Sequence, residues 1–343
     1  MFIKPGGTIM EYTSALSGYI TGLIEQKHSV GYKYNCEAAV LKRFDIFCGT
    51  HYPELKVLDK EIVLHWSKQR SGEHPSTLQN RITPVRDLAK YIINNGCQAY
   101  ILPKGVIPKS PRHLPYIYSD SEIKNIFSCI DKCRYCTEVP YRHLVMPLFF
   151  RLLYCCGLRL SEARLIKVKD VDVENGVITL FNTKFDRHRQ VPLSEKFHER
   201  LRIYYEKVHI LSNPDDWFFP GYNNKPMTLS NVYKNHRKFI WQAGISHSGR
   251  SRPGERGAAC IQSFRHTFAS HCLRNWISEG KNVQAYLPVL QSYMGHVSYK
   301  DTAYYLHLTT DLFPDIMLRL GNELGDIVPE INYPKDEDYE GSY

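Results

Sequence analysis

The chain has 343 residues, enough for two domains of ordinary size, and 43% of them are hydrophobic, so that it can bury substantial cores. Its formal charge of +9, from 44 basic against 35 acidic residues, suits a polyanionic partner, although charge alone leaves a merely solvated basic surface equally open. No apolar run approaches the roughly 18 to 20 residues of a membrane-spanning helix, and the N-terminus does not resemble a signal peptide, so we expect a cytoplasmic protein without membrane contacts.

The first part of the chain is expected to form a compact helical domain at residues 13–100, after an N-terminal extension at residues 1–12. Apolar residues recur there at spacings of three and four, and glycine, proline and asparagine separate the runs. The expected helices span residues 12–26, 34–50, 59–70 and 76–94. Basic residues are scattered through this domain: Lys27, Lys33, Arg43, Lys68, Arg70, Arg81 and Arg86. They belong either to a nucleic-acid-binding surface or to a bundle whose charges only face water.

Residues 101–116 are expected to link this domain to a second one. Four prolines stand among basic side chains in this segment, and proline disfavours regular structure. The residues concerned are Pro103, Pro108, Pro111 and Pro115 with Lys104, Lys109, Arg112 and His113. A basic extended segment of this kind either lies along a polyanion or serves only as a tether.

The second domain is expected at residues 117–325, followed by an acidic tail at residues 326–343 that should be disordered. Ser119 with Glu122 three residues later forms a capping box, which marks the start of a helix. A further helix at residues 142–153 is apolar on most sides and should therefore be buried.

A β signal follows these helices. Asn175-Gly176 is a strong hairpin turn, and it separates strand-like runs at residues 171–173 and 177–181. A third short strand, at residues 190–193, contains a proline, which implies a sheet edge because proline cannot donate a ladder hydrogen bond. The loop before this strand carries four basic residues, Lys184, Arg187, His188 and Arg189.

Ten cysteines raise the question of a metal site. Cys129, Cys133 and Cys136 have the spacing of an iron–sulfur motif, and His143 would complete a zinc set. The same stretch, however, has an apolar helical face, and nothing nearby resembles a glycine-rich cofactor site. In a cytosolic protein the cysteines are expected to be reduced thiols, mostly within cores. We therefore expect neither a metal nor any other cofactor.

Three short motifs in the last third of the chain contain side chains suited to a phosphodiester. Residues 262–269 read QSFRHTFA, Gly295-His296 stands at the end of a helical run, and Tyr305 lies nine residues beyond the histidine. A guanidinium matches phosphate oxygens with two parallel donors, and an imidazole exchanges protons near neutral pH. A tyrosine oxygen can carry a covalent phosphate. The pattern therefore favours chemistry on a phosphodiester.

These motifs resemble the C-terminal signature of the tyrosine recombinase (phage-integrase) family. That signature has a first arginine well upstream, and residues 157–162, GLRLSE, supply it as Arg159. The resemblance covers residues 14–325. It implies a mainly α fold with a small antiparallel β-sheet, in which an N-terminal helical core-binding domain and an α+β catalytic domain form a two-domain DNA clamp.

The resemblance implies that Tyr305 is the nucleophile and that Arg159 and Arg265 form a cationic clamp on the phosphate. Free tyrosine has a pKa of ~10, so attack needs help from nearby cations or a base. Glu162, three residues after Arg159, is a candidate for orienting that arginine. Tyr304 is the rival nucleophile; the nine-residue spacing favours Tyr305, and adjacent helical residues point about 100° apart.

Three further residues complete the implied site. Lys184 would donate a proton to the departing 5′ oxygen, and His296 would hydrogen-bond the phosphate or assist proton transfer at the tyrosine. The family usually has a histidine three residues before its second arginine, whereas this chain has Gln262. Glutamine can hydrogen-bond a phosphate oxygen but cannot gain or lose a proton near pH 7, so Gln262 cannot be a general base.

The function that the resemblance implies is that of a site-specific DNA recombinase or integrase. It would cleave and rejoin double-stranded DNA through a 3′-phosphotyrosine, without metal or ATP, for integration or excision of a mobile element. It would act as a homo-tetramer on two DNA sites, and the apolar run after Tyr305 either packs in its own subunit or is exchanged with a neighbour. Two alternatives stay open: a type IB topoisomerase-like enzyme that relaxes DNA, and a DNA-binding protein that has lost catalysis.

Overall fold

The computed structural model describes residues 12–107, 114–139, 141–181, 188–246 and 257–308. The chain divides into two compact units, residues 1–112 and residues 113–343, each with a hydrophobic core of its own. Within the described residues both units are mainly helical, and the second also contains a small antiparallel sheet, so the predicted fold class is confirmed. None of the helices in this part of the chain is long and apolar enough to cross a bilayer.

In its described residues, the first unit contains the helices α1 (Ser17–Ser29), α2 (Asn35–His51), α3 (Lys60–Ser67) and α4 (Pro75–Asn94). The four helices predicted from apolar spacing are confirmed, with ends that differ by at most five residues. Asp59 caps α3 by accepting a hydrogen bond from the Ile62 amide. Pro75 stands in the first turn of α4, where its missing amide donor costs nothing. Apolar side chains such as Phe44 are fully buried between these helices.

Two of the basic residues in this unit stabilise its own structure. The buried Arg81 side chain donates to the carbonyl of Trp66 and, with two nitrogens, to the carboxylate of Glu73. The buried Arg86 side chain donates to the carbonyls of residues 102 and 103, which fastens the following segment to α4. Among the other basic residues named above, four are exposed: Lys33, Arg43, Lys68 and Arg70. Only such exposed positions are available to a polyanion.

The second unit packs around a buried helix, α6 (Arg142–Cys155), as its apolar sequence predicts. Phe149 and Phe150 on this helix are 0% exposed. The helices α5 (Asp120–Asp131) and α8 (Glu195–Val208) pack against it. The predicted capping box is confirmed, because Ser119 and Glu122 exchange the two expected hydrogen bonds at the start of α5.

The described strands of this unit form an antiparallel sheet in the order β1 (Val171–Asp172), β2 (Val177–Leu180), β3 (Arg189–Pro192). In the register, Ile178 of β2 lies opposite Val191 of β3. The predicted hairpin is confirmed, and Gly176 in its turn has a φ of +64° that favours glycine. Pro192 lies on an edge strand, as predicted.

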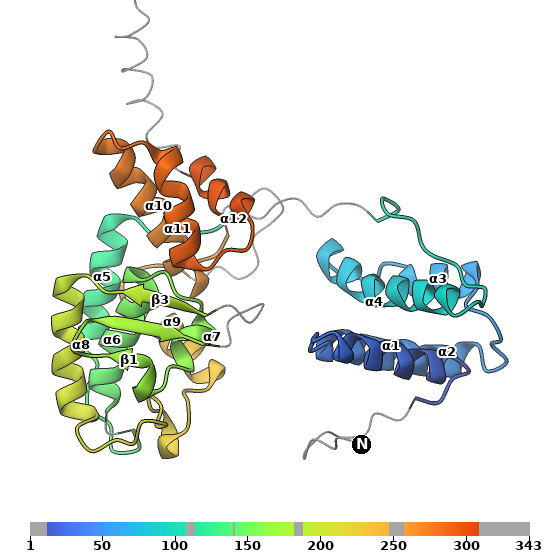
Figure 1. Cartoon of the computed structure of the whole chain (residues 1–343), viewed down its shortest axis with the longest axis horizontal. Helices are drawn as coiled ribbons and strands as arrows, with labels where there is room; N and C mark the ends of the chain where they lie inside the picture. The colour runs from blue at the N-terminus through green and yellow to red at the C-terminus, as the bar shows by residue number, and fades with distance from the viewer. Residues whose placement is uncertain (1–11, 108–113, 140, 182–187, 247–256, 309–343) are drawn as a thin grey trace, which may run out of the picture. The chain divides into compact units, whose positions relative to one another are not determined.

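The last elements of the second unit lie together at one end of it (Figure 1). There α10 (Gln262–Ser278) packs on α6, α11 (Val283–Met294) contacts β3, and the short helices α12 (Tyr299–Ala303) and η3 (Tyr304–Leu308) complete the group. A small separate core, which includes Leu287, Leu290 and Tyr305, holds this group together. The remaining described elements are α7 (Leu160–Arg164), η1 (Val168–Asp170), η2 (Tyr222–Asn224) and α9 (Leu229–Gln242).

Candidate active site

Two arginines lie at the ends of two helices. The helix α6 ends just before Gly157, and α11 ends at Gly295, which has the left-handed backbone of a helix C-cap. Arg265 on α10 is 2% exposed and donates to the carbonyls of Gly157 and Met294. Arg159 donates to the carbonyl of Gly295 at 2.9 Å. Carbonyls at a helix C-terminus lack partners within the helix and carry partial negative charge, so they attract guanidinium groups.

The two guanidinium groups interact electrostatically. Burial lowers the pKa of Arg265, and the positive charge of Arg159 lowers it further, to about 10. Arg265 therefore remains protonated at neutral pH. Two cations that are fixed before a substrate arrives form a site for the anionic oxygens of a phosphodiester.

Both glycines at these helix ends are required by their surroundings. Gly157 has a φ of +58°, and a Cβ atom there would collide with the ring of Phe268. Gly295 has a φ of +66°, and a Cβ atom there would stand 2.7 Å from Arg189 Nη1. A larger residue at either position would strain the backbone and displace a neighbouring side chain, Phe268 at the first position and Arg189 at the second.

A buried carboxylate, Glu162 of α7, connects the arginine pair to the sheet. It accepts hydrogen bonds from Arg159 Nη1 at 2.8 Å and from Arg189 Nη1 and Nη2 at 3.1 and 2.9 Å. Burial raises the pKa of Glu162, but the hydrogen bonds and charges of Arg189 and Arg159 outweigh burial and lower it below the usual value. The carboxylate is therefore ionised at neutral pH, and it holds Arg159 as the spacing suggested.

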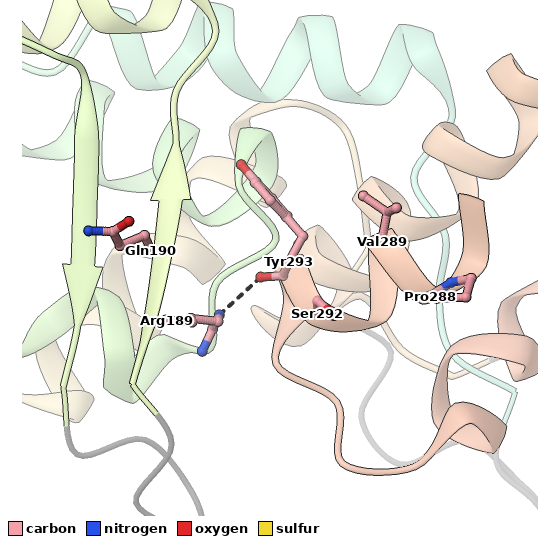
Figure 2. Close-up of a pocket in the computed structure, with 6 residues that line it drawn as sticks. All are labelled: Arg189, Gln190, Pro288, Val289, Ser292 and Tyr293. Carbon is pink, nitrogen blue, oxygen red and sulfur yellow. Dashed lines mark hydrogen bonds between the residues drawn. The ribbon is translucent and has the colours of Figure 1, made fainter. Parts of the chain in front are cut away.

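Three consecutive carbonyls at the end of α11 receive three different arginines. The carbonyls of residues 293, 294 and 295 accept hydrogen bonds from Arg189, Arg265 and Arg159, respectively. Figure 2 shows the first of these bonds, 3.0 Å long from Nε of Arg189. The placement of Arg189 in the preceding loop was wrong: it is the first residue of β3, and its pairing with Leu180 of β2 extends the sheet to it.

Tyr305 lies on η3 with its ring between two histidines. Its side chain is 3% exposed, and its Oη is hydrogen-bonded to Nδ1 of His266 at 2.9 Å. The ring lies nearly parallel to that of His296, with an angle of 14° and 6.1 Å between centroids. Burial raises the pKa of Tyr305 to about 12, although the charges of Arg265 and Arg159 act in the opposite direction. At neutral pH the group is thus a phenol rather than a phenolate.

His296 follows the left-handed Gly295 directly. Its Nδ1 is hydrogen-bonded at 2.8 Å to Oγ1 of Thr302, which is fully buried. Burial lowers the pKa of His296 to about 3, and the charges of Arg265 and Arg159 add to this effect. The imidazole is therefore neutral at pH 7, and it can exchange hydrogen bonds with a phosphate oxygen but cannot act there as a cation.

The structure brings Arg159, Arg265, His296 and Tyr305 together, as their motifs predict. Gln262 begins α10, one helical turn before His266. The rival Tyr304 has its ring centroid 6.2 Å from that of Tyr305. The predicted Lys184 lies outside the described residues.

Sequence reasoning assigned no role to two side chains of this site. His266 had a detectable signal, because it stands four residues after Gln262 and so shares a face of α10 with it. Arg189 had no local signal, because a basic residue at the end of a basic loop looks like a solvated charge. Its burial against Glu162 and α11 depends on the tertiary structure.

A shallow groove of about 510 Å³ lies beside the arginines, between β3 and α11 (Figure 2). Its lining residues are Arg189, Gln190, Pro288, Val289, Ser292 and Tyr293. Since Arg189 also binds Glu162, the groove and the arginine network share a side chain.

The cysteine cluster does not form a metal site in the part of the chain that the structure describes. No three His, Cys, Asp or Glu side chains gather there in a way that could hold a metal ion. Within the cluster, Sγ of Cys136 lies 2.7 Å from a carboxylate oxygen of Glu138.

The chain is similar to known proteins over most of its length. The model of the phage integrase family matches residues 119–311. Two putative integrase/recombinase proteins of Sinorhizobium fredii (strain NBRC 101917 / NGR234) are among the similar proteins. The first, y4rB, is 29% identical over 87% of this chain and 94% of its own length. The second, y4rE, is 30% identical over 84% of this chain and 90% of its own length. Among solved structures, that of the XerH site-specific recombinase bound to palindromic difH substrate is similar, with a TM-score of 0.58 and 22% sequence identity. The match covers 82% of this chain and 78% of the XerH chain, and it supports the fold.

Proposed function

This chain belongs to the phage integrase family of tyrosine recombinases, which cleave and join DNA strands, and we propose that it is a site-specific recombinase acting through a 3′-phosphotyrosine on Tyr305. The observation that carries the proposal is the meeting of a buried tyrosine with two fixed guanidinium groups and two imidazoles. These groups come from four separate segments of the chain, and together they supply a nucleophile, charge stabilisation and proton exchange.

In the proposed reaction, Oη of Tyr305 attacks the phosphorus while the bond from phosphorus to the 5′ oxygen breaks. Arg159 and Arg265 stabilise the charge on the non-bridging oxygens, and neutral His296 hydrogen-bonds one of them. Lys184 protonates the departing 5′ oxygen. A 5′ hydroxyl from a second DNA strand then attacks the phosphotyrosine. Because the covalent bond conserves the energy of the phosphodiester, rejoining requires no ATP.

The two units would divide the work in this proposal. The helical domain at residues 13–100 would bind the DNA site with its exposed basic residues, residues 101–116 would link the domains, and the domain at residues 117–325 would carry the chemistry. The protein would act in the cytoplasm as a homo-tetramer on two double-stranded DNA sites, in the integration or excision of a mobile element. The relatives named as putative integrases support this biological role.

A covalent-trapping assay tests the central claim. Purified protein is incubated in EDTA with labelled nicked duplexes that span the ends of the DNA element encoding it. The wild type is expected to give an adduct that survives denaturation, and the Tyr305→Phe variant is expected to give none. Tyr304→Phe is the matched control, because it removes a neighbouring phenol, and it should still give the adduct.

Other results would redirect the proposal. An adduct with Tyr305→Phe but none with Tyr304→Phe would move the nucleophile to Tyr304. Binding of DNA by the wild type without any adduct would favour a DNA-binding protein that has lost catalysis. Relaxation of a supercoiled plasmid that lacks the recombination site would indicate a topoisomerase-like activity.

A further inference from the structure

The proposed cleavage leaves one proton without an assigned acceptor. Tyr305 is protonated at neutral pH, because burial raises its pKa to about 12. Its proton must leave Oη as the bond to phosphorus forms. Gln262, at the position where the family usually has a histidine, cannot take up a proton near pH 7. The acceptor must therefore be another group close to Oη.

The geometry singles out one side chain at this position. In the described part of the chain, Oη of Tyr305 is hydrogen-bonded to the titratable side chain of His266, whose Nδ1 is 2.9 Å away. His296 is differently placed, because its ring faces that of Tyr305 and its Nδ1 is bonded to Thr302. Its low pKa of about 3 also makes it a weak base.

The backbone explains how the histidine reaches this place. His266 stands one turn after Gln262 on α10, and residues four apart lie on the same helix face. It also follows Arg265 directly, and that arginine is fixed by the carbonyls of Gly157 and Met294. The rigid helix therefore holds an imidazole at the nucleophile, on the face where Gln262 lacks one.

We propose that His266 is a catalytic residue that accepts the phenolic proton of Tyr305 during strand cleavage and returns it during rejoining. This inference rests on the proposed recombinase function. In cleavage, the proton moves from Oη to Nδ1 of His266, the oxygen electron pair forms the bond to phosphorus, and the 5′ oxygen leaves with a proton from Lys184. In rejoining, the 5′ hydroxyl returns its proton to the neutral amine of Lys184 as its oxygen attacks phosphorus, the bond from phosphorus to Oη breaks, and protonated His266 gives its proton to Oη.

The first experiment separates proton transfer from simple positioning. The rate of adduct formation on the nicked duplex is measured in a single turnover for wild type, His266→Ala and His266→Asn. Asparagine can keep a hydrogen bond to Oη but cannot accept a proton. Both variants are expected to react about 100-fold or more slowly, within the range of general base catalysis. If His266→Asn reacts within about threefold of wild type, His266 only positions the tyrosine and the proposal is wrong.

The chain offers a matched control for these variants. His271 lies on the same helix, and its Nδ1 is also 2.9 Å from a tyrosine hydroxyl, that of Tyr154. The His271→Asn variant therefore makes the same chemical change in a second histidine–tyrosine pair that lies outside the site. It is expected to form the adduct at the wild-type rate. A loss equal to that of His266→Asn would assign both effects to helix stability and overturn the proposal.

A second experiment bypasses the tyrosine and tests the fold of the site. A DNA strand that ends in a 3′-p-nitrophenyl phosphate is joined to a 5′ hydroxyl by the Tyr305→Ala variant, which leaves room for the nitrophenyl group. Nitrophenolate leaves without needing a proton. Introducing His266→Asn into the Tyr305→Ala variant should leave the rate of nitrophenolate release unchanged, whereas introducing Arg159→Ala should abolish the release. A large loss with His266→Asn would mean that the histidine acts on the phosphate or the fold, and it would contradict the inference.

The two proposals fail in different ways. If the wild type forms no adduct and the Tyr305→Ala variant releases no nitrophenolate, the recombinase function fails, and this inference fails with it. If the wild type forms the adduct, the Tyr305→Ala variant releases nitrophenolate, and the His266 variants form the adduct at the wild-type rate, the recombinase function stands and the role of His266 is overturned.

Discussion

At the scale of single residues, the site depends on a balance of buried charges. Arg159, Arg189 and Arg265 bring positive charge into one small region, and Glu162 supplies a carboxylate to two of them. A buried ion pair adds little net stability, but a buried charge that has lost its partner costs several kcal/mol. The arrangement therefore tolerates the removal of a single member poorly.

The first prediction concerns this carboxylate. Glu162→Gln is expected to lower the free energy of unfolding by about 3 kcal/mol at pH 7, because the amide keeps the shape but leaves two guanidinium groups without their counter-charge. Adduct formation should also slow, because Arg159 loses the group that orients it. Chemical denaturation and the trapping assay measure these effects, with the exposed Glu199→Gln as a control that should change neither.

The same variant has a pH dependence with a definite sign. The pKa of Glu162 is lower in the folded protein than in the unfolded chain. Its contribution to stability is therefore complete above the unfolded pKa and is lost as the pH falls through the folded pKa. The difference in unfolding free energy between wild type and Glu162→Gln should narrow below about pH 4. A difference that stays constant down to pH 3 would show that the charge is not the cause.

At the scale of elements, two helix ends supply backbone groups to the site, beside the side chains that α10 contributes. The ends of α6 and α11 supply the carbonyls that hold the arginine side chains, and both ends use glycine with a positive φ. Such a backbone is unfavourable for other residues by about 1 to 2 kcal/mol. A substitution at these positions therefore has two separable effects, one on the backbone and one on the arginine side chains.

A pair of glycine variants separates the two effects. Gly295→Ala and Gly280→Ala both replace a glycine with nearly the same φ, +66° and +69°, but only a Cβ at Gly295 would meet another side chain, that of Arg189. Both variants are expected to lose about 1 kcal/mol of stability. Only Gly295→Ala should also slow adduct formation, by about tenfold or more, because it displaces Arg189 from Glu162. Equal rates for the two variants would refute this account.

The elements of this fold were largely predictable from local patterns, and the contacts between them were not. The apolar spacing of the helices, the Ser119 capping box and the Asn175-Gly176 turn each act within a few residues, so the sequence displays them directly. The motif residues of the candidate site were also recognisable. The burial of Arg189 and the bond from His266 to Tyr305 depend on how β3, α10 and η3 pack, which no local pattern records.

At the scale of the whole molecule, the net charge of +9 has two parts with different consequences. Some basic residues are buried and serve the fold, as Arg81 does with Glu73 at 2.9 Å. Others, such as Arg43, remain in contact with water. Counting charges from the sequence treats both kinds alike, whereas only the exposed kind can release counterions from DNA.

This distinction leads to a prediction for DNA binding. Replacing four of the exposed basic residues together, as Lys33→Gln, Arg43→Gln, Lys68→Gln and Arg70→Gln, should weaken binding and flatten its dependence on salt, by about one unit of slope per lost phosphate contact. The melting temperature should stay unchanged. Arg81→Gln should instead lower the free energy of unfolding by about 3 kcal/mol, because it strands Glu73. Binding titrations at several salt concentrations and thermal melts measure both, and an unaltered slope in the fourfold variant would place the DNA contacts elsewhere.

The end of α11 ties three guanidinium groups to one piece of backbone. Since the carbonyls of residues 293, 294 and 295 follow one another in a single helix end, no one of them shifts without its neighbours. The three guanidinium groups thus share one helix end, in addition to the contacts that Glu162 makes with Arg159 and Arg189 and that the Gly157 carbonyl makes with Arg265. A displacement of the end of α11 would therefore disturb the contacts of all three arginines at once.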